Sequence, residues 1–217
     1  AFGNVFFFTL FGVCSMTVIW LAQRFIHQKK FSELGFKRNA APTLLVGFIV
    51  GVFLVSVKYG LQMLFADDVT VAFIDSDTSA LSYIGYYLYF LFGFIIWNSL
   101  IEEVGTRAYP IQKLKDHMNP HIIFTIMGII FAVGHFALND FSMGYFISLF
   151  VASYIYSLLY YYSGSIWLTI GMHSGVNWVG FSFFGHNWKL GALTNIEILG
   201  GNPVIMDYIG AVIQLLF

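Results

Sequence analysis

A series of long apolar segments constrains this chain most strongly. We place them at about Phe2–Ala22, Thr43–Ala66, Leu81–Ile101, His121–Leu138, Tyr145–Tyr162, Ser165–Phe184 and Val204–Phe217. Several reach the roughly 20 residues that a helix needs to cross about 30 Å of hydrocarbon. Their continuity excludes a transmembrane barrel, whose strands are about ten residues long and alternate in polarity. The sequence therefore predicts an all-α, polytopic helical membrane protein with about seven transmembrane helices, the last of them short.

Composition agrees with this prediction. The 217 residues are 59% hydrophobic and only 10% charged, whereas soluble domains carry roughly 25% charged residues. The net charge of -1 and the absence of a basic stripe argue against a nucleic-acid partner. Cys14 is the only cysteine, which excludes an intramolecular disulfide. Because no linker or internal repeat divides the chain, we expect a single membrane domain over residues 1–217.

The basic residues predict an orientation. Eight of the ten lie after the first or third apolar segment, namely Arg24, Lys29, Lys30, Lys37, Arg38, Arg107, Lys113 and Lys115. Cytoplasmic loops are enriched in such residues, so both stretches should be cytoplasmic. The other connections are acidic and contain a single cation, Lys189. We therefore expect the N-terminus outside, and a bacterial cytoplasmic membrane from the short chain without organelle signals.

A few polar side chains interrupt the apolar segments, where each costs at least about 2.5–3.5 kcal/mol on insertion scales. They are Lys58, Glu102, Glu103, His135, His173 and Asn177, with Arg107 as a counter-ion. Glu103 and Arg107 are four apart, acid before base, which places them on one helical face. Glu102 is rotated from Glu103 by about 100° and lacks that partner. Headgroup solvation or simple hydrogen bonds between helices could also explain these residues.

Helical spacing suggests how these groups could meet. If segments three and four form a hairpin turning near His117–Pro120, Glu102 and His135 lie at the same level. The third helix must then continue past Arg107, with a bend at Pro110, because proline disturbs the helical hydrogen bonds. His173 and Asn177 are also four apart and share one face of segment six. Gly171 and Gly175 lie on the opposite face, where a neighbouring helix can approach closely.

Three motifs, Glu102-Glu103-x-x-x-Arg107, Phe131-x-x-x-His135 and His173-x-x-x-Asn177, resemble the signature of the CAAX-protease and bacteriocin-processing family of intramembrane proteases. This family contains the type II CAAX prenyl endopeptidases. The resemblance covers a motif-bearing core at about residues 81–184. The chain differs at Thr106, where the family usually has an aromatic residue.

The resemblance implies an endopeptidase whose catalytic residues are Glu102, His135, His173 and Asn177. Glu102 would deprotonate a water that His135 orients, since an apolar pocket suits a carboxylate to general base catalysis. His173 and Asn177 would donate hydrogen bonds to the oxyanion. Glu103 and Arg107 would support the helix. The substrate would be a peptide or membrane protein, possibly prenylated.

Two kinds of alternative remain. Glu102, His135 and His173 could instead ligate a catalytic zinc, with water in the fourth position. We prefer the version without a cofactor, because the sequence has no His-Glu-x-x-His motif.

A protein without catalytic activity, such as a bacteriocin-immunity or scaffolding protein, could keep the same pocket for binding. A small transporter could use the acid and histidines to relay protons.

Overall fold

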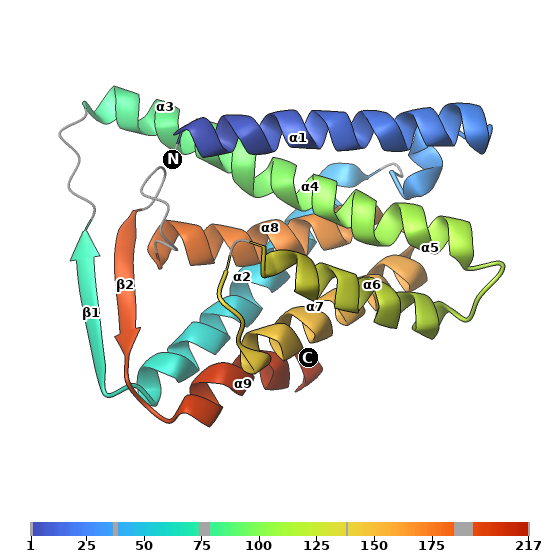
Figure 1. The fold of residues 1–217 in the computed structure, drawn as a ribbon. Coiled ribbons are helices and arrows are strands. Elements are labelled where there is room, and N and C mark those ends of the chain that lie inside the picture. The colour runs from blue at the N-terminus through green and yellow to red at the C-terminus, as the bar shows by residue number, and fades with distance from the viewer. Residues whose placement is uncertain (1, 37–38, 74–78, 138, 185–192, 217) are drawn as a thin grey trace.

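The computed structural model describes residues 2–36, 39–73, 79–137, 139–184 and 193–216, and helices dominate it (Figure 1). The α-helices are α1 (Phe2–Leu21), α2 (Ala40–Leu64), α3 (Ala80–Phe90), α4 (Trp97–Glu103), α5 (Tyr109–Leu114), α6 (Pro120–His135), α7 (Met143–Ser163), α8 (Ile166–Phe183) and α9 (Pro203–Leu216). Three π-helical segments continue or join them, η1 (Ala22–Ile26), η3 (Leu91–Ile96) and η4 (Val104–Ala108), and η2 (Phe31–Leu34) is a 3₁₀-helix.

Each of the seven apolar segments forms a helix, which confirms the predicted fold class. Four stretches are long and apolar enough to cross a membrane, namely Phe6–Ile26, Ala40–Leu64, Ala80–Leu114 and Met143–Ser163. Pro120–His135 and Val204–Leu216 are shorter apolar helices. A helix of 16 residues such as α6 is about 24 Å long, less than the hydrocarbon thickness. The chain is therefore an integral membrane protein, and the number of seven spans stays a prediction.

The connections gather at two ends of the helical assembly (Figure 1). At one end the Ile166 amide donates to the Gly35 carbonyl, and the Tyr160 hydroxyl donates to the Leu34 carbonyl. This end carries the described basic connections after α1 and α5. The acidic strands β1 (Asp68–Phe73) and β2 (Thr194–Leu199) lie at the other end. Basic and acidic connections thus lie at opposite ends, as the predicted orientation requires. Which end faces the cytoplasm stays a prediction.

An antiparallel two-stranded ribbon, β1 with β2, was not expected from the sequence. Its register pairs Val69 with Ile198 and Val71 with Ile196, so apolar side chains lie opposite each other on one face. The alternation of apolar and polar residues in both segments is the signal that could have predicted strands. The ribbon ties the end of α2 to the connection between α8 and α9.

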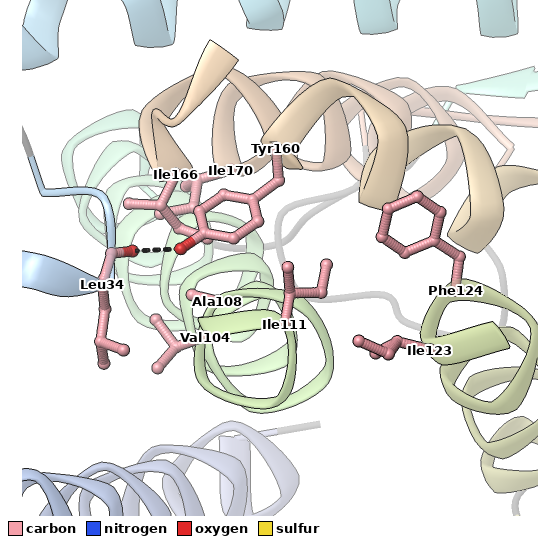
Figure 2. Packing of buried hydrophobic residues seen from close by; sticks show 9 residues of the cluster. All are labelled: Leu34, Val104, Ala108, Ile111, Ile123, Phe124, Tyr160, Ile166 and Ile170. Carbon is pink, nitrogen blue, oxygen red and sulfur yellow. Dashed lines mark hydrogen bonds between the residues drawn. The ribbon is translucent and has the colours of Figure 1, made fainter. Parts of the chain in front are cut away.

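The largest buried cluster lies at the basic end and joins α6, α7 and α8 to the helix that carries Glu102 (Figure 2). Its members are Leu34, Val104, Ala108, Ile111, Ile123, Phe124, Tyr160, Ile166 and Ile170. Tyr160 is the polar member, and its hydroxyl also accepts a hydrogen bond from Gln112 Nε2 at 3.1 Å. This core fixes the position of the helix immediately beyond the candidate site.

Helices α2 and α8 pack backbone against backbone through their glycines. A Cβ on Gly47 or Gly51 would meet the backbone of Leu168 or Met172, and one on Gly171 or Gly175 would meet the backbone of α2. The expectation that α8 presents a smooth glycine face to a neighbour is therefore confirmed. His173 projects from the same helix toward the interior, where its side chain is buried.

Candidate active site

The first motif lies in an unbroken helix over Ala80–Leu114 that contains two π-helical segments. One of them, η4, begins directly after Glu103 and ends before Tyr109. π-Bulges occur frequently at functional sites, because the wider turn redirects the side chains that follow. The wide turn also precedes Pro110, whose ring would otherwise crowd the carbonyl four residues earlier. The helix thus continues past Arg107 into α5, as the predicted hairpin with α6 required.

Glu103 joins the helix of the first motif to α8. Its side chain is fully buried, and Oε1 accepts hydrogen bonds from Arg107 Nη1 at 3.1 Å and from His173 Nδ1 at 2.9 Å. The ion pair with Arg107 confirms the contact predicted from their spacing of four residues. The bond to His173 joins helices 70 residues apart in sequence. Because a carboxylate only accepts, it places a proton on Nδ1 of His173 and directs Nε2 elsewhere.

Glu102 faces His173 from the other side. Its Oε2 lies 3.6 Å from His173 Nε2, and its Oε1 accepts a hydrogen bond from Asn98 Nδ2 at 2.7 Å. The side chain retains 26% exposure, yet Oε2 is buried and forms no hydrogen bond with the described residues. As predicted, Glu102 is not paired with Arg107. One carboxylate oxygen is therefore held by Asn98, while the other faces His173 Nε2.

Arg107 is completely buried beside Glu103. Its guanidinium lies 4.2 Å from the centre of the Phe131 ring and 5.5 Å from that of Tyr156. Such contacts stabilise a desolvated cation through the negative face of the ring. Nη1 also donates to the Thr106 hydroxyl, which in turn donates to the Glu102 carbonyl, both at 2.5 Å. Thr106, the departure from the family pattern, thus links Arg107 to the backbone of Glu102.

His135 is the last residue of α6 and is half-buried. Its Nδ1 lies 2.8 Å from the Phe131 carbonyl, which can only accept, so Nδ1 carries a proton and Nε2 is left as an acceptor. The Phe131 ring, one turn earlier, contacts Arg107 and lies 6.2 Å from His173. Helix α6 runs antiparallel to the helix that carries the first motif. The step of one turn from Phe131 to His135 therefore covers the same depth as the step of one turn from Arg107 back to Glu103. The predicted common level of His135 and Glu102 fits this register.

Asn177 lies one turn beyond His173 on α8 and is half-buried. Its side chain forms no hydrogen bond with any residue that the structure describes. The structure thus brings Glu102, Glu103, Arg107 and His173 into direct contact. His135 approaches this group through Phe131, and Asn177 is near it only along α8.

The zinc alternative can be compared with this geometry. Among the described residues, no three His, Cys, Asp or Glu side chains gather closely enough to hold a metal ion. One nitrogen of His173 is already bonded to Glu103, and Nδ1 of His135 to a carbonyl. These bonds leave Nε2 of both histidines open, as they are in metal-ligating histidines. The choice between the zinc and the metal-free mechanism therefore stays a prediction, and we derive no step through a metal.

Sequence reasoning missed three neighbours of the site. Asn98 holds Glu102, and Tyr156 lies against both Arg107 and His173, with ring centres 5.8 Å apart in the second pair. Tyr145 on α7 faces His135, with the ring centres 6.4 Å apart. Asn98 could have been found, because it is a polar residue four positions before Glu102 in an apolar segment. The two tyrosines carry no such local signal, since α7 is rich in tyrosine.

The comparisons with known proteins agree with the motifs. No curated protein and no solved structure matches the chain. One family description, Type II CAAX prenyl endopeptidase Rce1-like, matches residues 84–179, which include all three motifs. This match supports a CAAX-type intramembrane endopeptidase in general. The resemblance predicted from the motifs is thereby confirmed: over residues 84–179 the chain matches the Rce1-like family of type II CAAX prenyl endopeptidases.

Proposed function

We propose that this protein is an intramembrane endopeptidase that hydrolyses a peptide bond in a membrane-associated peptide or protein through a water activated by Glu102. One observation carries the proposal. Oε2 of Glu102 is buried, forms no hydrogen bond with the residues that the structure describes and lies 3.6 Å from His173 Nε2, while Asn98 holds Oε1. A base needs this combination of fixed orientation and an unoccupied acceptor.

In the proposed reaction, Glu102 takes a proton from water as the water oxygen attacks the scissile carbonyl carbon. His135 assists by accepting a hydrogen bond from the same water at Nε2, the nitrogen that its bond to Phe131 leaves available. The C–N bond then breaks, and the proton passes from Glu102 to the leaving nitrogen. The products are a carboxylic acid and an amine, so one water is consumed and Glu102 is regenerated.

His173 and Asn177 would stabilise the oxyanion that forms on the carbonyl oxygen. In this role His173 carries protons on both ring nitrogens, one given to Glu103 and the other to the oxyanion. Glu103 fixes the orientation of the ring, and Arg107 balances the charge of Glu103. Asn177 has an uncommitted amide one helical turn away, about 6 Å along the axis. Known oxyanion donors contribute about 2.7–4 kcal/mol each.

The decisive experiment compares purified wild-type protein with Glu102→Gln on peptides from the membrane and secreted proteome of its host. We expect the variant to fold normally but to lose cleavage, because a carboxamide cannot accept the proton. Glu197→Gln is the matched control, since it makes the same change on the exposed strand β2 and should cleave normally.

Three outcomes would refute parts of this proposal. Cleavage by Glu102→Gln at the wild-type rate would remove Glu102 as the base. If the wild-type protein cleaves no peptide and Glu102→Gln keeps its full biological effect, a binding or immunity role would be favoured. Loss of cleavage in a chelator, restored by added zinc, would replace the metal-free mechanism that we propose.

A further inference from the structure

A cluster of cations lies at the basic end of the assembly, where α1 and α5 end (Figure 1). Residues 24–33 and 113–116 contain five lysine and arginine side chains, accompanied by the carboxylates of Glu33 and Asp116. The ion pairs that the described residues form all lie at the candidate site, so none of these cations is paired within the described part of the chain. A positive surface without its own counter-ions attracts an anionic partner.

The centre of this cluster has a defined geometry. His27 Nε2 lies 3.0 Å from the Tyr109 hydroxyl, and this hydrogen bond joins the turn after α1 to α5. Lys113 lies one turn after Tyr109, with its Nζ 5.8 Å from the centre of the Tyr109 ring. Partial burial lowers the pKa of His27 below its ordinary value, and the charges of Lys113 and Lys29 lower it further. Both amines therefore act on one small area around a neutral imidazole.

The backbone of the turn after α1 holds Lys29 in a fixed place. The His27 amide donates to the Ala22 carbonyl, and the Lys29 amide donates to the Gln23 carbonyl, both at 2.9 Å. Between them Gln28 has a φ of 53°, in the left-handed region that residues other than glycine seldom adopt. Such a conformation persists only where the surrounding structure determines it, and it occurs often at ligand-binding sites. The Lys29 side chain therefore extends from an ordered turn.

The cluster lies at the level of the lipid headgroups. The two candidate spans that lead to it, Phe6–Ile26 and Ala80–Leu114, both end here. In the last turns of the first span, the exposed rings of Trp20 and Phe25 pack edge to face with their centres 6.2 Å apart. Tryptophan is enriched where a span meets the membrane surface, and lysines near a span end extend their amines toward the headgroups. The two amines are thus placed at the depth of the lipid phosphates.

From this arrangement we propose that Lys29 and Lys113 bind the phosphate of an anionic phospholipid. The inference goes beyond the proposed endopeptidase function and does not depend on it. Ammonium groups only donate hydrogen bonds, and the oxygens of a phosphodiester accept them. Basic pockets between membrane helices bind such headgroups. A zwitterionic lipid brings its own cation, which the surrounding positive charges repel. A bound lipid would connect the end of α1 to α5, the helix that continues from Arg107.

Lipid binding can be measured on the purified protein in micelles of an uncharged detergent. The probes are phosphatidylglycerol and phosphatidylcholine with pyrene on one acyl chain, followed by energy transfer from the protein tryptophans. We expect phosphatidylglycerol to bind about tenfold or more tightly, because each lysine near an anionic headgroup contributes to the attraction. Lys29→Gln with Lys113→Gln should remove this preference. Arg24→Gln with Lys115→Gln is the matched control, since it removes two exposed cations from the same end and should keep the preference.

Several results would overturn the inference. They are equal affinities of the wild-type protein for the two lipids, a preference that survives Lys29→Gln with Lys113→Gln, and an equal loss of preference in the control. Inorganic phosphate at the concentration of the lipid should leave the labelled phosphatidylglycerol bound, and displacement would assign the two amines to a soluble phosphate instead.

Melting curves separate lost binding from unfolding. Lys29→Gln with Lys113→Gln should melt as the wild-type protein does, because neither amine forms an ion pair within the described part of the chain. If this double variant melts early, Lys29→Gln alone decides, since Lys29 is exposed. It should reduce the preference about fivefold, and an unchanged preference would overturn the inference.

Discussion

The buried pair of Arg107 and Glu103 makes a sharp prediction about stability. We expect Arg107→Met to destabilise the protein by about 3–5 kcal/mol, the typical cost of removing one partner of a buried ion pair. Both side chains have 0% exposure and are 3.1 Å apart, so water cannot replace the lost guanidinium. Methionine keeps much of the apolar length that packs on Phe131, and the loss should therefore reflect charge more than volume.

The size of this destabilisation depends on the interactions that the Glu103 carboxylate keeps in Arg107→Met. Without Arg107, its carboxylate keeps the hydrogen bond from His173 but no cation that is permanently charged beside it. A destabilisation of 3–5 kcal/mol raises the unfolded fraction more than a hundredfold, since each 1.4 kcal/mol is a factor of ten. The double variant Glu103→Gln with Arg107→Met removes both charges. It should be clearly more stable than Arg107→Met alone, because no buried charge is then left unpaired.

The assay is guanidinium-induced unfolding of purified protein in detergent micelles, followed by tryptophan fluorescence. Arg24→Met is the matched control, because Arg24 is exposed and its loss should change stability by no more than about 0.5 kcal/mol. A double-mutant cycle gives the coupling energy between residues 103 and 107. The reasoning is refuted if Arg107→Met stays within about 1 kcal/mol of wild type, or if the double variant is no more stable than the single one.

Two further substitutions test the packing and the orientation of the site. Gly51→Ala should destabilise the protein by about 1–3 kcal/mol and reduce cleavage, because the new methyl group meets the backbone of Met172 beside His173. The control Gly60→Ala should be neutral or stabilising, because nothing lies within 4 Å of the added methyl group. Equal melting temperatures for the two variants would contradict this prediction. Asn98→Ala should lower kcat/KM about tenfold or more with little change in melting, because Glu102 loses the hydrogen bond that orients it. Asn195→Ala, which removes a similar bond to Glu197 on the exposed ribbon, should leave cleavage unchanged, and an equal loss in both would argue against orientation of Glu102.

Local patterns in the sequence determined much of this protein. Hydropathy predicted the helices. In lipid the backbone N–H and C=O groups must form hydrogen bonds within the protein, and for a long apolar segment a helix is the simplest way to form them. The pairing of Glu103 with Arg107 was also predictable, since it depends only on neighbouring turns of one helix. The exposed ribbon was missed because its partners, such as Val69 and Ile198, are far apart in sequence and each strand has only six residues.

Tertiary structure alone decided which carboxylate meets which imidazole. The sequence assigned Glu103 to Arg107 alone, whereas the fold brings His173 between both glutamates, with Nδ1 on Glu103 and Nε2 toward Glu102. This contact depends on the choice of α2 as the helix that meets the glycine face of α8 and on the π-helical turn after Glu103. Neither follows from a spacing of 3.6 residues per turn. A contact between residues 70 positions apart depends on how whole helices pack against each other. Patterns along a single sequence indicate only contacts between neighbouring turns of one helix.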